Sequence, residues 1–384
     1  MTADSKEPST DLAALRAEIE RLDGNLLDLL ARRMAWAEAV AGAKLDAAWP
    51  FRDPAREDRL LVHLRRSAVE RGLDPHEIER LYRVVLDMSV ARQQAFVREL
   101  PDTPLRVAYQ GAEGSYSHLA AQRRYAGRAG GVLLAGHESF RDAADAVLGG
   151  DADLALLPIE NSTAGSINQT YDLLAEGRLV ITGEEVAAIE HCLLALPGVE
   201  LGEVRTAISH PQALAQCEAF FREHPAIRPR EEFDTAGAAR KVREAGDRSL
   251  AAVASAAAAG TYGLESLARG IQTDAGNATR FVEVALQPVP VPPAGAVKTS
   301  LVLTLAAERP GALGEILSEF ARRGLNLTKL ESRPIPGSRW AYRFYLDVQG
   351  HASTDAFRAA LAAIAPATTE LAVLGSYPAA EPVG

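Results

Sequence analysis

The sequence predicts a multidomain protein with an all-α helical part, a two-lobed α/β part and an α+β part of the ferredoxin-like βαββαβ order. Residues 11–100 carry only helical periodicity, and residues 104–286 alternate short apolar runs with helical patterns. Residues 297–379 follow the order strand, helix, strand, strand, helix, strand. Four prolines within 287–295 predict a semi-rigid linker before this last part. A chain of 384 residues has room for two or three such domains.

Three helices are expected in the first part. The first runs to about Lys44, and its apolar residues recur at spacings of three and four. These residues are Leu12, Leu15, Ile19, Leu22, Leu26 and Leu29. A helix this long needs partners along its length, so we expect an oligomeric helical bundle. A second helix begins at Asp53-Pro54 and ends at Gly72, and a third runs from the capping sequence 74–77 to about Glu99.

The α/β part contains six short apolar runs, which we interpret as strands of mostly parallel sheets. They are Leu105–Tyr109, Gly131–Ala135, Asp153–Ile159, Cys192–Leu196, Val204–Ile208 and Leu250–Ala254. A last strand begins near Asn277, and the whole part is long enough for two lobes with a cleft between them. In the final part, strands are expected at 300–305, 325–332, 342–348 and 371–375, with helices at 310–323 and 354–364.

Composition narrows the possible functions. The net charge of −10 argues against nucleic acid and anionic membranes as partners, and anionic ligands would need local Arg and Lys side chains. Cys192 and Cys217 have neither metal-ligand spacing nor a disulfide framework, so we interpret them as core thiols of a cytoplasmic protein. Residues 1–10 lack the apolar core of a signal peptide, and the Ala-rich run 249–263 is too short to span a bilayer.

One residue of the first helix breaks its apolar pattern. Continuing the seam from Leu29 leads to Arg33, then to Trp36 and Val40, so a guanidinium stands where an apolar side chain belongs. Lys44 lies close to the same face, roughly 16 Å farther along the axis. The two cations could converge on a small dianion. The alternative is a solvated bundle in which Arg33 is paired with a Glu.

Eight polar residues of this part stand in the order found in the all-helical chorismate mutases, which residues 11–100 resemble. They are Arg16, Arg33, Lys44, Asp53, Arg56, Glu57, Ser89 and Gln93. The match includes Arg-Asp at 52–53, Arg-Glu at 56–57 and Ser-Val-x-x-Gln at 89–93. The resemblance implies a rearrangement of chorismate to prephenate, catalysed by holding the compact conformer and stabilising charge as it separates.

The resemblance also implies how the residues act. Arg33 and Arg16, the latter from a second subunit, would clamp the two substrate carboxylates. Lys44 and Gln93 would donate to the ether oxygen as it gains negative charge. The other implied contacts are those of Glu57 with the substrate hydroxyl, of Asp53 through its backbone, and of Ser89 with a carboxylate.

Polar clusters follow strand ends or open helices and strands at four places in the α/β part, which are 111–118, 160–163, 209–216 and 277–281. Each cluster alone fits a cap or turn, but four at sheet rims favour a cleft for a small polar anion. The first cluster is neither GxGxxG nor a P-loop, which gives a nucleotide site no support. His118, His191 and His210 lack metal-ligand spacing, and the serines lack a nucleophile elbow. We therefore expect neither a metal nor another cofactor.

These clusters, with Glu-His-Cys-Leu-Leu at 190–194 and the Ala-rich motif at 254–264, resemble the prephenate dehydratases, and Thr-Arg-Phe at 279–281 is the sharpest signature. Many relatives place Thr or Ser where this chain has Ala278. The resemblance implies loss of water and CO2 from prephenate to give phenylpyruvate, with Thr279 donating to the leaving hydroxyl. The implied supporting residues are Asn161, Ser209 and Gln216 for orientation, Glu160 for water or the Thr279 network, and Arg280 for a carboxylate or a surface ion pair.

Two turns of the final part form a further candidate ligand site. Pro310-Gly311-Ala312-Leu313 opens a helix with small residues that let a carboxylate approach the backbone amides. Glu331-Ser332-Arg333-Pro334 ends a strand, and ordinary turn chemistry also explains both segments. In their βαββαβ setting they resemble the ACT regulatory domains of dehydratases. That resemblance implies phenylalanine binding at these residues, near a subunit interface, and end-product inhibition.

Over nearly its whole length the chain resembles the bifunctional chorismate mutase–prephenate dehydratases (P-proteins) of phenylalanine biosynthesis, and a homodimer is expected. One alternative is a monofunctional prephenate dehydratase whose helical segment only dimerises. Another is a ligand-sensing protein that uses the two-lobed cleft for binding alone. An NAD-dependent prephenate dehydrogenase is disfavoured because the sequence has no dinucleotide-binding glycine fingerprint.

Overall fold

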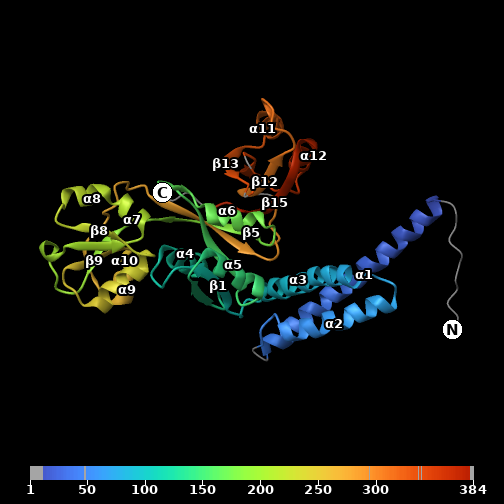
Figure 1. Cartoon of the computed structure of the whole chain (residues 1–384), viewed down its shortest axis with the longest axis horizontal. Coiled ribbons are helices and arrows are strands. Elements are labelled where there is room, and N and C mark those ends of the chain that lie inside the picture. Colours follow the sequence, from blue (N-terminus) through green and yellow to red (C-terminus); the bar gives the residue numbers. More distant parts are fainter. Residues whose placement is uncertain (1–11, 47–48, 294, 336, 339, 381–384) are drawn as a thin grey trace. The chain divides into compact units, whose positions relative to one another are not determined.

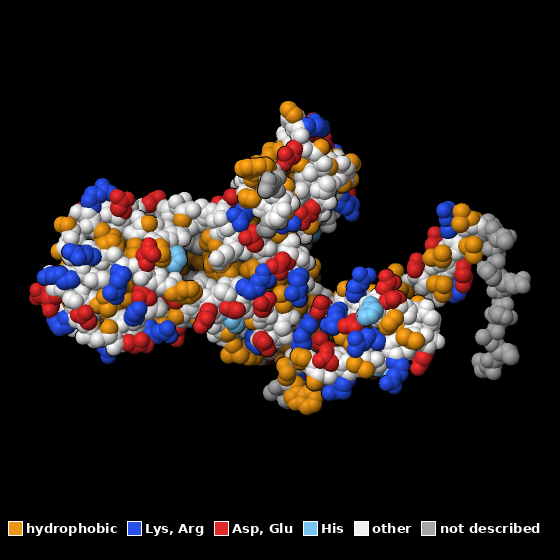
Figure 2. Space-filling model, viewed as in Figure 1, with side chains coloured by type: hydrophobic (Ala, Val, Ile, Leu, Met, Phe, Trp, Pro, Cys, Tyr) orange, Lys and Arg blue, Asp and Glu red, His pale blue; other side chains and the backbone are white. Residues whose placement is uncertain are grey.

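A computed structural model describes residues 12–46, 49–293, 295–335, 337–338 and 340–380, and the prediction for residues 1–10 lies outside them. The chain divides into two compact units, before and after the Leu100–Pro101 junction (Figure 1). In the described part, no helix is long and apolar enough to cross a membrane. Acidic and basic side chains are interspersed on the face shown in Figure 2, without a large area of one sign.

The first unit consists of the three expected helices, α1 (Leu12–Asp46), α2 (Pro54–Glu70) and α3 (Pro75–Glu99). The Asp53 side chain caps α2 by accepting from the Arg56 backbone N–H at 3.0 Å. Asp74 caps α3 in the same way, with bonds of 2.8 and 2.9 Å from the next two free N–H groups. Both α1 and α2 pack on α3, but the apolar seam in the N-terminal half of α1 is exposed.

The first lobe of the second unit is a mixed sheet in the order β2-β1-β3-β11-β5. Its strands are β1 (Leu105–Gln110), β2 (Val132–His137), β3 (Leu154–Asn161), β5 (Val180–Ala188) and β11 (Ala278–Ala285), and β4 (Gly165–Ser166) pairs with β3. Its helices are α4 (Tyr116–Tyr125), α5 (Phe140–Gly149) and α6 (Asn168–Ala175). β1, β2 and β3 are parallel, whereas β11 is antiparallel to both of its neighbours.

The second lobe is another mixed sheet, in the order β10-β6-β9-β7-β8. Its strands are β6 (Cys192–Ala195), β7 (Thr206–Ser209), β8 (Arg228–Glu231), β9 (Leu250–Ala254) and β10 (Glu265–Ala268). Its helices are α7 (Pro211–Gln216), α8 (Glu218–Glu223), α9 (Thr235–Ala245) and α10 (Ala256–Tyr262), with a short 3-10 turn at Leu201–Glu203. Cys192 and Cys217 are free and buried, which confirms them as core thiols, and burial raises the pKa of Cys217 to about 12.

The six expected strands are present, but the prediction of mostly parallel sheets is wrong. The chain leaves the first lobe after β5 and re-enters it through β11, which therefore runs against both β3 and β5. Antiparallel strands can pair without a helical crossover between them. No crossover helix in the sequence therefore indicates the direction of β11. The second lobe is mixed for a similar reason, because β6 runs against both β9 and β10.

The final part has the expected βαββαβ order, with the sheet β13-β14-β12-β15. Its elements are β12 (Val297–Leu305), α11 (Ala312–Arg322), β13 (Leu327–Pro334), β14 (Tyr342–Gln349), α12 (Asp355–Ile364), a 3-10 turn (Ala365–Ala367) and β15 (Thr368–Pro378). Leu301 and Leu303 of β12 face the two helices, where they pack with Phe320 and Phe357. Val302, on the opposite face, belongs to a different cluster, as the two-residue period of a strand requires.

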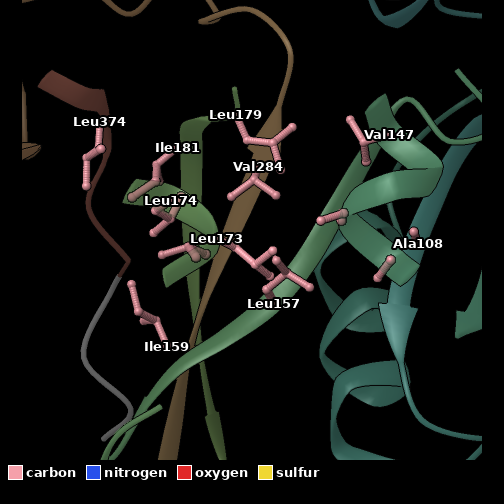
Figure 3. Close-up of a cluster of buried hydrophobic side chains, with 14 of the residues drawn as sticks. Ala108, Val147, Leu157, Ile159, Leu173, Leu174, Leu179, Ile181, Val284 and Leu374 are labelled. Atoms are coloured by element: carbon pink, nitrogen blue, oxygen red, sulfur yellow. The ribbon is translucent and has the colours of Figure 1, made fainter. Parts of the chain in front are cut away.

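That second cluster joins the final part to the first lobe. Leu374 and Tyr377 of β15 pack with Leu174 of α6 and Ile181 of β5, and Figure 3 shows Leu374 beside this group. The strands approach so closely that a Cβ on Gly375 would lie 2.0 Å from the Ile181 carbonyl oxygen. The segment 287–295 is therefore not the only connection, because a shared hydrophobic core also holds the final part to the lobe.

Candidate active sites

A cavity of about 240 Å³ lies among the three helices of the first unit. It is lined by Arg33, Trp36, Ala37, Val40, Lys44, Phe51, Asp53, Arg56, Glu57, Leu60, Leu86, Ser89, Val90 and Gln93. All the predicted chorismate-binding residues except Arg16 are on this list. The side chains that the sequence placed on three separate helices therefore share one cavity, with three cations and two carboxylates around it.

Arg33 lies against α3 rather than against an acid. Its Nη1 donates to the Ser89 hydroxyl and, at 3.1 Å, to the Val85 carbonyl oxygen. Among the described residues no carboxylate lies within ion-pair distance of it, so the alternative of a Glu-paired bundle is wrong for this residue. Burial, and to a lesser degree the charge of Arg56, lowers the pKa of Arg33. Its charge remains available to an anion in the cavity.

Lys44 is the second cation without an acidic partner in the described residues. Its Nζ donates to the carbonyl oxygen of Phe51, in the segment that joins α1 to α2. Burial and the nearby Arg56 lower the pKa of Lys44, against the opposing effect of Asp53 and Glu57. Among the described residues the ammonium has no ion pair, so an anion that entered the cavity would be attracted to it, although Asp53 and Glu57 offset part of its charge.

Ser89 and Gln93 occupy successive turns of α3, and both are buried. The Gln93 Nε2 donates to the Ser89 carbonyl oxygen at 3.2 Å, while its buried Oε1 has no partner in the described residues. The amide NH2 has two hydrogens and this bond uses one of them, so the side chain can accept through Oε1 and can also donate a second N–H to a ligand. Glu57, across the cavity, lies 3.6 Å from Arg52.

Arg16 lies apart from this cavity. It is exposed on the uncovered half of α1, and seventeen residues of helix place it about 25 Å from Arg33 along the axis. An arginine side chain spans far less than this distance. Within one chain, Arg16 therefore does not reach the cavity that Arg33 lines.

A second cavity, of about 390 Å³, is lined by residues from both lobes of the second unit. All four predicted polar clusters contribute to it, through Gly111, Ser115, Tyr116, Ser117, Asn161, His210, Gln212, Ala213, Gln216, Thr279 and Phe281. The prediction of one cleft built from these clusters is confirmed. Several other lining residues carry no recognisable signal in the sequence, and these are Glu138, Ser139, Phe140, Ile167, Gln169, Phe233, Asp234 and Thr235.

No lysine or arginine is among the described residues that line this cavity, so the expectation of local cations is wrong here. The lining instead includes the first residues of α4, α5, α6 and α9. Helix N-termini carry partial positive charge and unpaired N–H groups. The start of α6, near Ile167 and Gln169, has no side-chain cap, which leaves its N–H groups open to a carboxylate.

Asn161 sits at the centre of a hydrogen-bonded group in this cavity, and this group includes Thr279. Asn161 Nδ2 lies 3.0 Å from the Thr279 hydroxyl and 2.8 Å from Asn277 Oδ1. Gln216 Nε2 in turn lies 3.0 Å from Asn161 Oδ1. Three predicted residues, Thr279, Asn161 and Gln216, are thus brought together.

Three other predicted residues do not line the cavity. Ser209 is fully buried and donates to the Val253 carbonyl oxygen at 2.6 Å. Glu160 and Arg280 pair with each other across β3 and β11, one residue from Asn161 and Thr279. Because neighbouring residues of a strand point to opposite faces, these two side chains lie behind the sheet.

Arg280 contacts three carboxylates, at 3.4 Å from Glu160, 3.1 Å from Glu184 and 2.8 Å from Asp347 of β14. Burial opposes its charge, but Asp347 and Glu184 raise the pKa of Arg280. Lys329 of β13 adds a bond of 2.7 Å to Glu160. The structure therefore assigns Arg280 to a buried ionic network between the first lobe and the final part, in place of the carboxylate site or surface ion pair expected from the sequence.

The candidate phenylalanine residues fall in two places at one end of the final sheet. Thr304 of β12 and Arg333 of β13 both pair with Arg343 of β14. The loop after β12 and the end of β13 therefore lie at the same end of the sheet, on either side of β14. Gly311 has a φ of 85°, and α11 starts there without a side-chain cap. Ala312, Leu313, Ser332 and Pro334 are exposed or half-buried.

Two of the β13 residues contact the first lobe. Glu331 accepts from the Ser166 hydroxyl at 2.6 Å, and Arg333 lies 3.0 Å from Asp172. The end of β13 is thus both a candidate ligand-binding segment and a point of contact with the dehydratase-like lobe. Within the described ranges no group of three or more His, Cys, Asp or Glu residues could hold a metal ion.

One chain therefore combines a cation-lined cavity among helices with a cleft of amides, hydroxyls and helix N-termini, and this defines a two-site enzyme for small anions. Family models match all three parts of the chain. Residues 15–94 match chorismate mutase type II, residues 107–288 match prephenate dehydratase, and residues 299–366 match the ACT domain.

Curated relatives extend this agreement over the whole chain. Bifunctional chorismate mutase/prephenate dehydratases are 38% identical in Enterobacter agglomerans, covering 97% of both chains, and 38% identical in Escherichia coli K12, covering 96% of both. The chain belongs to this family of bifunctional enzymes, and it carries a chorismate mutase and a prephenate dehydratase.

Solved structures resemble the second unit. A prephenate dehydratase from Arthrobacter aurescens in complex with L-Phe is 33% identical with a TM-score of 0.65, covering 71% of this chain and 90% of that one. A protein described as a novel type of quorum quenching acylase is 38% identical with a TM-score of 0.64, covering 71% and 98%. Each of these matches covers at least 90% of the solved chain and 71% of this one.

Proposed function

We propose that the helical cavity rearranges chorismate and that the two-lobed cleft converts the resulting prephenate to phenylpyruvate. The working parts are residues 11–100, 104–286 and 297–379. The carrying observation is that Arg33, Lys44 and Gln93 share one cavity while Thr279, Asn161 and Gln216 share another. The helical cavity offers cations and an amide for the negative charge that develops on the ether oxygen. The cleft offers a hydroxyl that can donate to the leaving group.

In the helical cavity the reaction needs charge stabilisation and no proton transfer. Arg33, helped by Ser89, would hold one carboxylate of chorismate. The ether C–O bond breaks as the new C–C bond forms, and negative charge gathers on the ether oxygen. Lys44 and the Gln93 amide would donate to that oxygen, and Glu57 would accept from the substrate hydroxyl. No residue has to change its protonation state.

The mutase site would be completed by a second copy of the chain. The exposed apolar seam of α1 includes Leu12, Ile19, Leu22 and Leu29, and each of these side chains is more than half exposed. An exposed apolar stripe of this kind favours packing against another apolar surface. A second α1 would supply that surface, and it would bring Arg16 of the partner subunit to the cavity that Arg16 cannot reach within its own chain.

Complementation tests this arrangement. Arg16→Ala and Arg33→Ala should each remove mutase activity when assayed alone. After denaturation and refolding together, half the dimers should be mixed, and one intact cavity in each should restore about a quarter of the parental activity. Failure to restore activity would mean that Arg16 does not act across subunits. Dehydratase activity of both variants serves as the control.

In the cleft, the Thr279 hydroxyl would donate to the ring hydroxyl of prephenate as it leaves. The C–C bond to the ring carboxylate gives its electron pair to the ring, and CO2 departs. The C–O bond breaks with its pair, and one proton taken up overall makes water. No Lys or Arg of the described ranges lines this cleft, which favours decarboxylation, because strong pairing would stabilise the carboxylate that must become neutral CO2.

Feeding chorismate to the purified protein tests both halves together. Thr279→Ala should accumulate prephenate with little phenylpyruvate, and Gln93→Ala should consume chorismate slowly yet convert added prephenate normally. Loss of both activities in either variant would contradict the assignment of separate sites. A protein that binds either compound without turning it over would instead be a sensor.

We also propose that the ACT domain binds phenylalanine and inhibits the dehydratase. Support comes from the uncapped start of α11, whose N–H groups can receive a carboxylate, and from the positive φ of Gly311 at that turn. Gly311→Ala or Ser332→Ala should raise the phenylalanine concentration needed for half-inhibition. Unchanged inhibition in both variants would place the site elsewhere. The two free, buried cysteines support a reducing, cytoplasmic setting.

A further inference from the structure

The wall of the dehydratase cavity contains a hydrogen-bond chain that extends beyond the three residues brought together around Thr279. Gln216 Oε1 lies 2.9 Å from His191 Nε2, and His191 Nδ1 lies 2.9 Å from the Tyr116 hydroxyl. His191 and Tyr116 line the cavity, and His191 is only 2% exposed. The proposed roles give these two side chains nothing to do.

Backbone donors fix the direction of this chain at Asn161. The Asn161 Oδ1 accepts from the backbone N–H groups of Thr163 at 3.1 Å and Ala164 at 2.9 Å. Since an N–H group cannot accept, the amide oxygen must face these donors and the amide nitrogen must face Thr279. The Thr279 oxygen therefore accepts from Asn161 Nδ2, and its own O–H remains free to donate into the cavity.

The same reasoning continues outward from Asn161. The group of Gln216 that faces Asn161 Oδ1 must be its NH2, which also lies 2.7 Å from the Thr163 hydroxyl oxygen. Gln216 Oε1 therefore faces His191, and His191 Nε2 must carry the proton between them. Burial lowers the pKa of His191, so the ring is neutral and Nδ1 carries no proton. The one Tyr116 hydroxyl hydrogen is then shared between Nδ1 and the Glu190 carbonyl oxygen.

Tyr116 is itself held in place. Its hydroxyl lies 2.7 Å from the Glu190 carbonyl oxygen as well as near His191 Nδ1, and its ring packs edge-on against the imidazole at 5.4 Å. The His191 backbone N–H is also fixed, by a bond of 2.9 Å to Gln272 Oε1. These contacts define the position of the imidazole before any substrate binds, and the Gln216 contact defines its tautomer.

We propose that His191 is a positioning residue of the dehydratase, which locks the Gln216 amide in the orientation that keeps Asn161 donating to Thr279. Without the Nε2–H donor, Gln216 Oε1 loses its partner. Rotation of the amide, which sets its oxygen against Asn161 Oδ1, then costs one hydrogen bond less than in the parent. Two opposed oxygens loosen Asn161, and the Thr279 hydroxyl loses its preset direction. The proposal rests on the proposed role of Thr279.

A matched set of variants tests the proposal in the full-length protein. His191→Leu removes the donor but keeps an apolar side chain of similar bulk, whereas His191→Gln places an amide N–H near the position of Nε2. We expect His191→Leu to lower kcat on prephenate about tenfold or more with KM within about threefold, and His191→Gln to stay within about threefold of the parent. His224→Leu, which changes a histidine of the same lobe away from the cavity, should leave kcat unchanged.

Combination with Gln216→Ala separates positioning from a general structural effect. If His191 acts through Gln216, adding His191→Leu to Gln216→Ala should lower kcat by less than about twofold further. A full additional loss, an unchanged kcat in His191→Leu, or equal damage from His191→Gln would each overturn the proposal. Nitrogen NMR of the imidazole supplies a readout independent of turnover, and a proton found on Nδ1 alone would also overturn it.

Thr279→Ala, measured in parallel, keeps the two proposals apart. If that variant retains parental kcat, the proposed dehydratase mechanism fails whatever His191 does. If Thr279→Ala is inactive while His191→Leu is unaffected, the mechanism stands and the positioning role of His191 is wrong. Thermal unfolding of each variant shows whether a loss of kcat reflects a loss of fold.

Discussion

At the scale of single residues, Gln93 is a buried polar side chain whose hydrogen-bonding groups are not all used by the described part of the fold. It is 6% exposed, it makes one bond to the Ser89 carbonyl oxygen, and its Oε1 has no partner among the described residues. The sequence showed that Ser89 and Gln93 share a helix face. Only the packing of α1 and α2 against α3 shows that this face closes a cavity.

Replacing Gln93 tests its role as a neutral donor. Gln93→Ala should lower mutase kcat at least about tenfold, because the ether oxygen loses a donor as it gains charge. Gln93→Glu keeps the size but places a carboxylate there, so its activity should be low at neutral pH and rise as acid protonates the new group. Equal activity of Gln93→Glu and the parent at pH 8 would contradict a donor role. Helical content from circular dichroism is the control.

Lys44 predicts a pH dependence. Burial and Arg56 lower the pKa of Lys44, and only the protonated ammonium can stabilise the ether oxygen. Activity is therefore full below this pKa and falls as the pH rises through it, earlier than for a free lysine. Arg56→Gln should shift the alkaline fall of kcat to higher pH. In Lys44→Arg, whose guanidinium stays charged, that fall should disappear below about pH 12, and a persisting fall would assign it to another group.

At the scale of elements, the sequence identified strands by their apolar runs and missed those without one. β8 is the exposed edge sequence Arg-Pro-Arg-Glu, and β5 carries Gly183, Glu184 and Glu185 in its middle. Glu184 is buried only because Arg280 and Lys298 pair with it from other elements. A strand of this kind is stabilised by partners distant in sequence, and the local sequence pattern does not indicate those partners.

The strand pair β3–β11 explains why some of the predicted site residues line the cavity and others do not. The motifs placed Glu160 beside Asn161 and Arg280 beside Thr279, and the sequence could not show which member of each pair faces the cavity. That depends on what covers the back of the sheet, and the final part covers it here. Motif recognition located the right elements, and the alternation of side chains then divided their residues between two functions.

The element scale yields a test of Arg280. Arg280→Gln would leave Glu184 and Asp347 buried without their shared cation, which should lower the free energy of unfolding by about 3 kcal/mol. The KM for prephenate should change little, since Arg280 does not line the cavity. Chemical denaturation and steady-state kinetics measure the two effects. A large rise in KM at unchanged stability would return Arg280 to the role of a carboxylate binder.

At the scale of the second unit, the lobe that carries Thr279 and the ACT domain share a hydrophobic core and a buried ionic network. Lys329 and Asp347 contact Glu160 and Arg280, which stand next to Asn161 and Thr279 on the same two strands. Any shift of the ACT sheet relative to the first lobe therefore acts on the strands that hold Thr279, the proposed donor to the leaving hydroxyl. Coupling between the two sites requires that these strands have two arrangements. Ligands at both sites must then change the equilibrium between those arrangements.

Lys329→Gln tests this coupling most directly, because it removes one ionic contact between the domains at the side chain of β13 that pairs with Glu160. We expect kcat without phenylalanine to stay close to the parent and the half-inhibitory phenylalanine concentration to rise about threefold to tenfold. Arg343→Gln is the matched control, since Arg343 pairs with Glu370 inside the ACT domain. Direct binding of phenylalanine, measured by calorimetry, separates weaker coupling from a damaged ligand site. Because coupling is reciprocal, a true coupling variant should also show a smaller effect of a bound substrate analogue on phenylalanine affinity, and a parental response in both assays would exclude this ionic contact as the link.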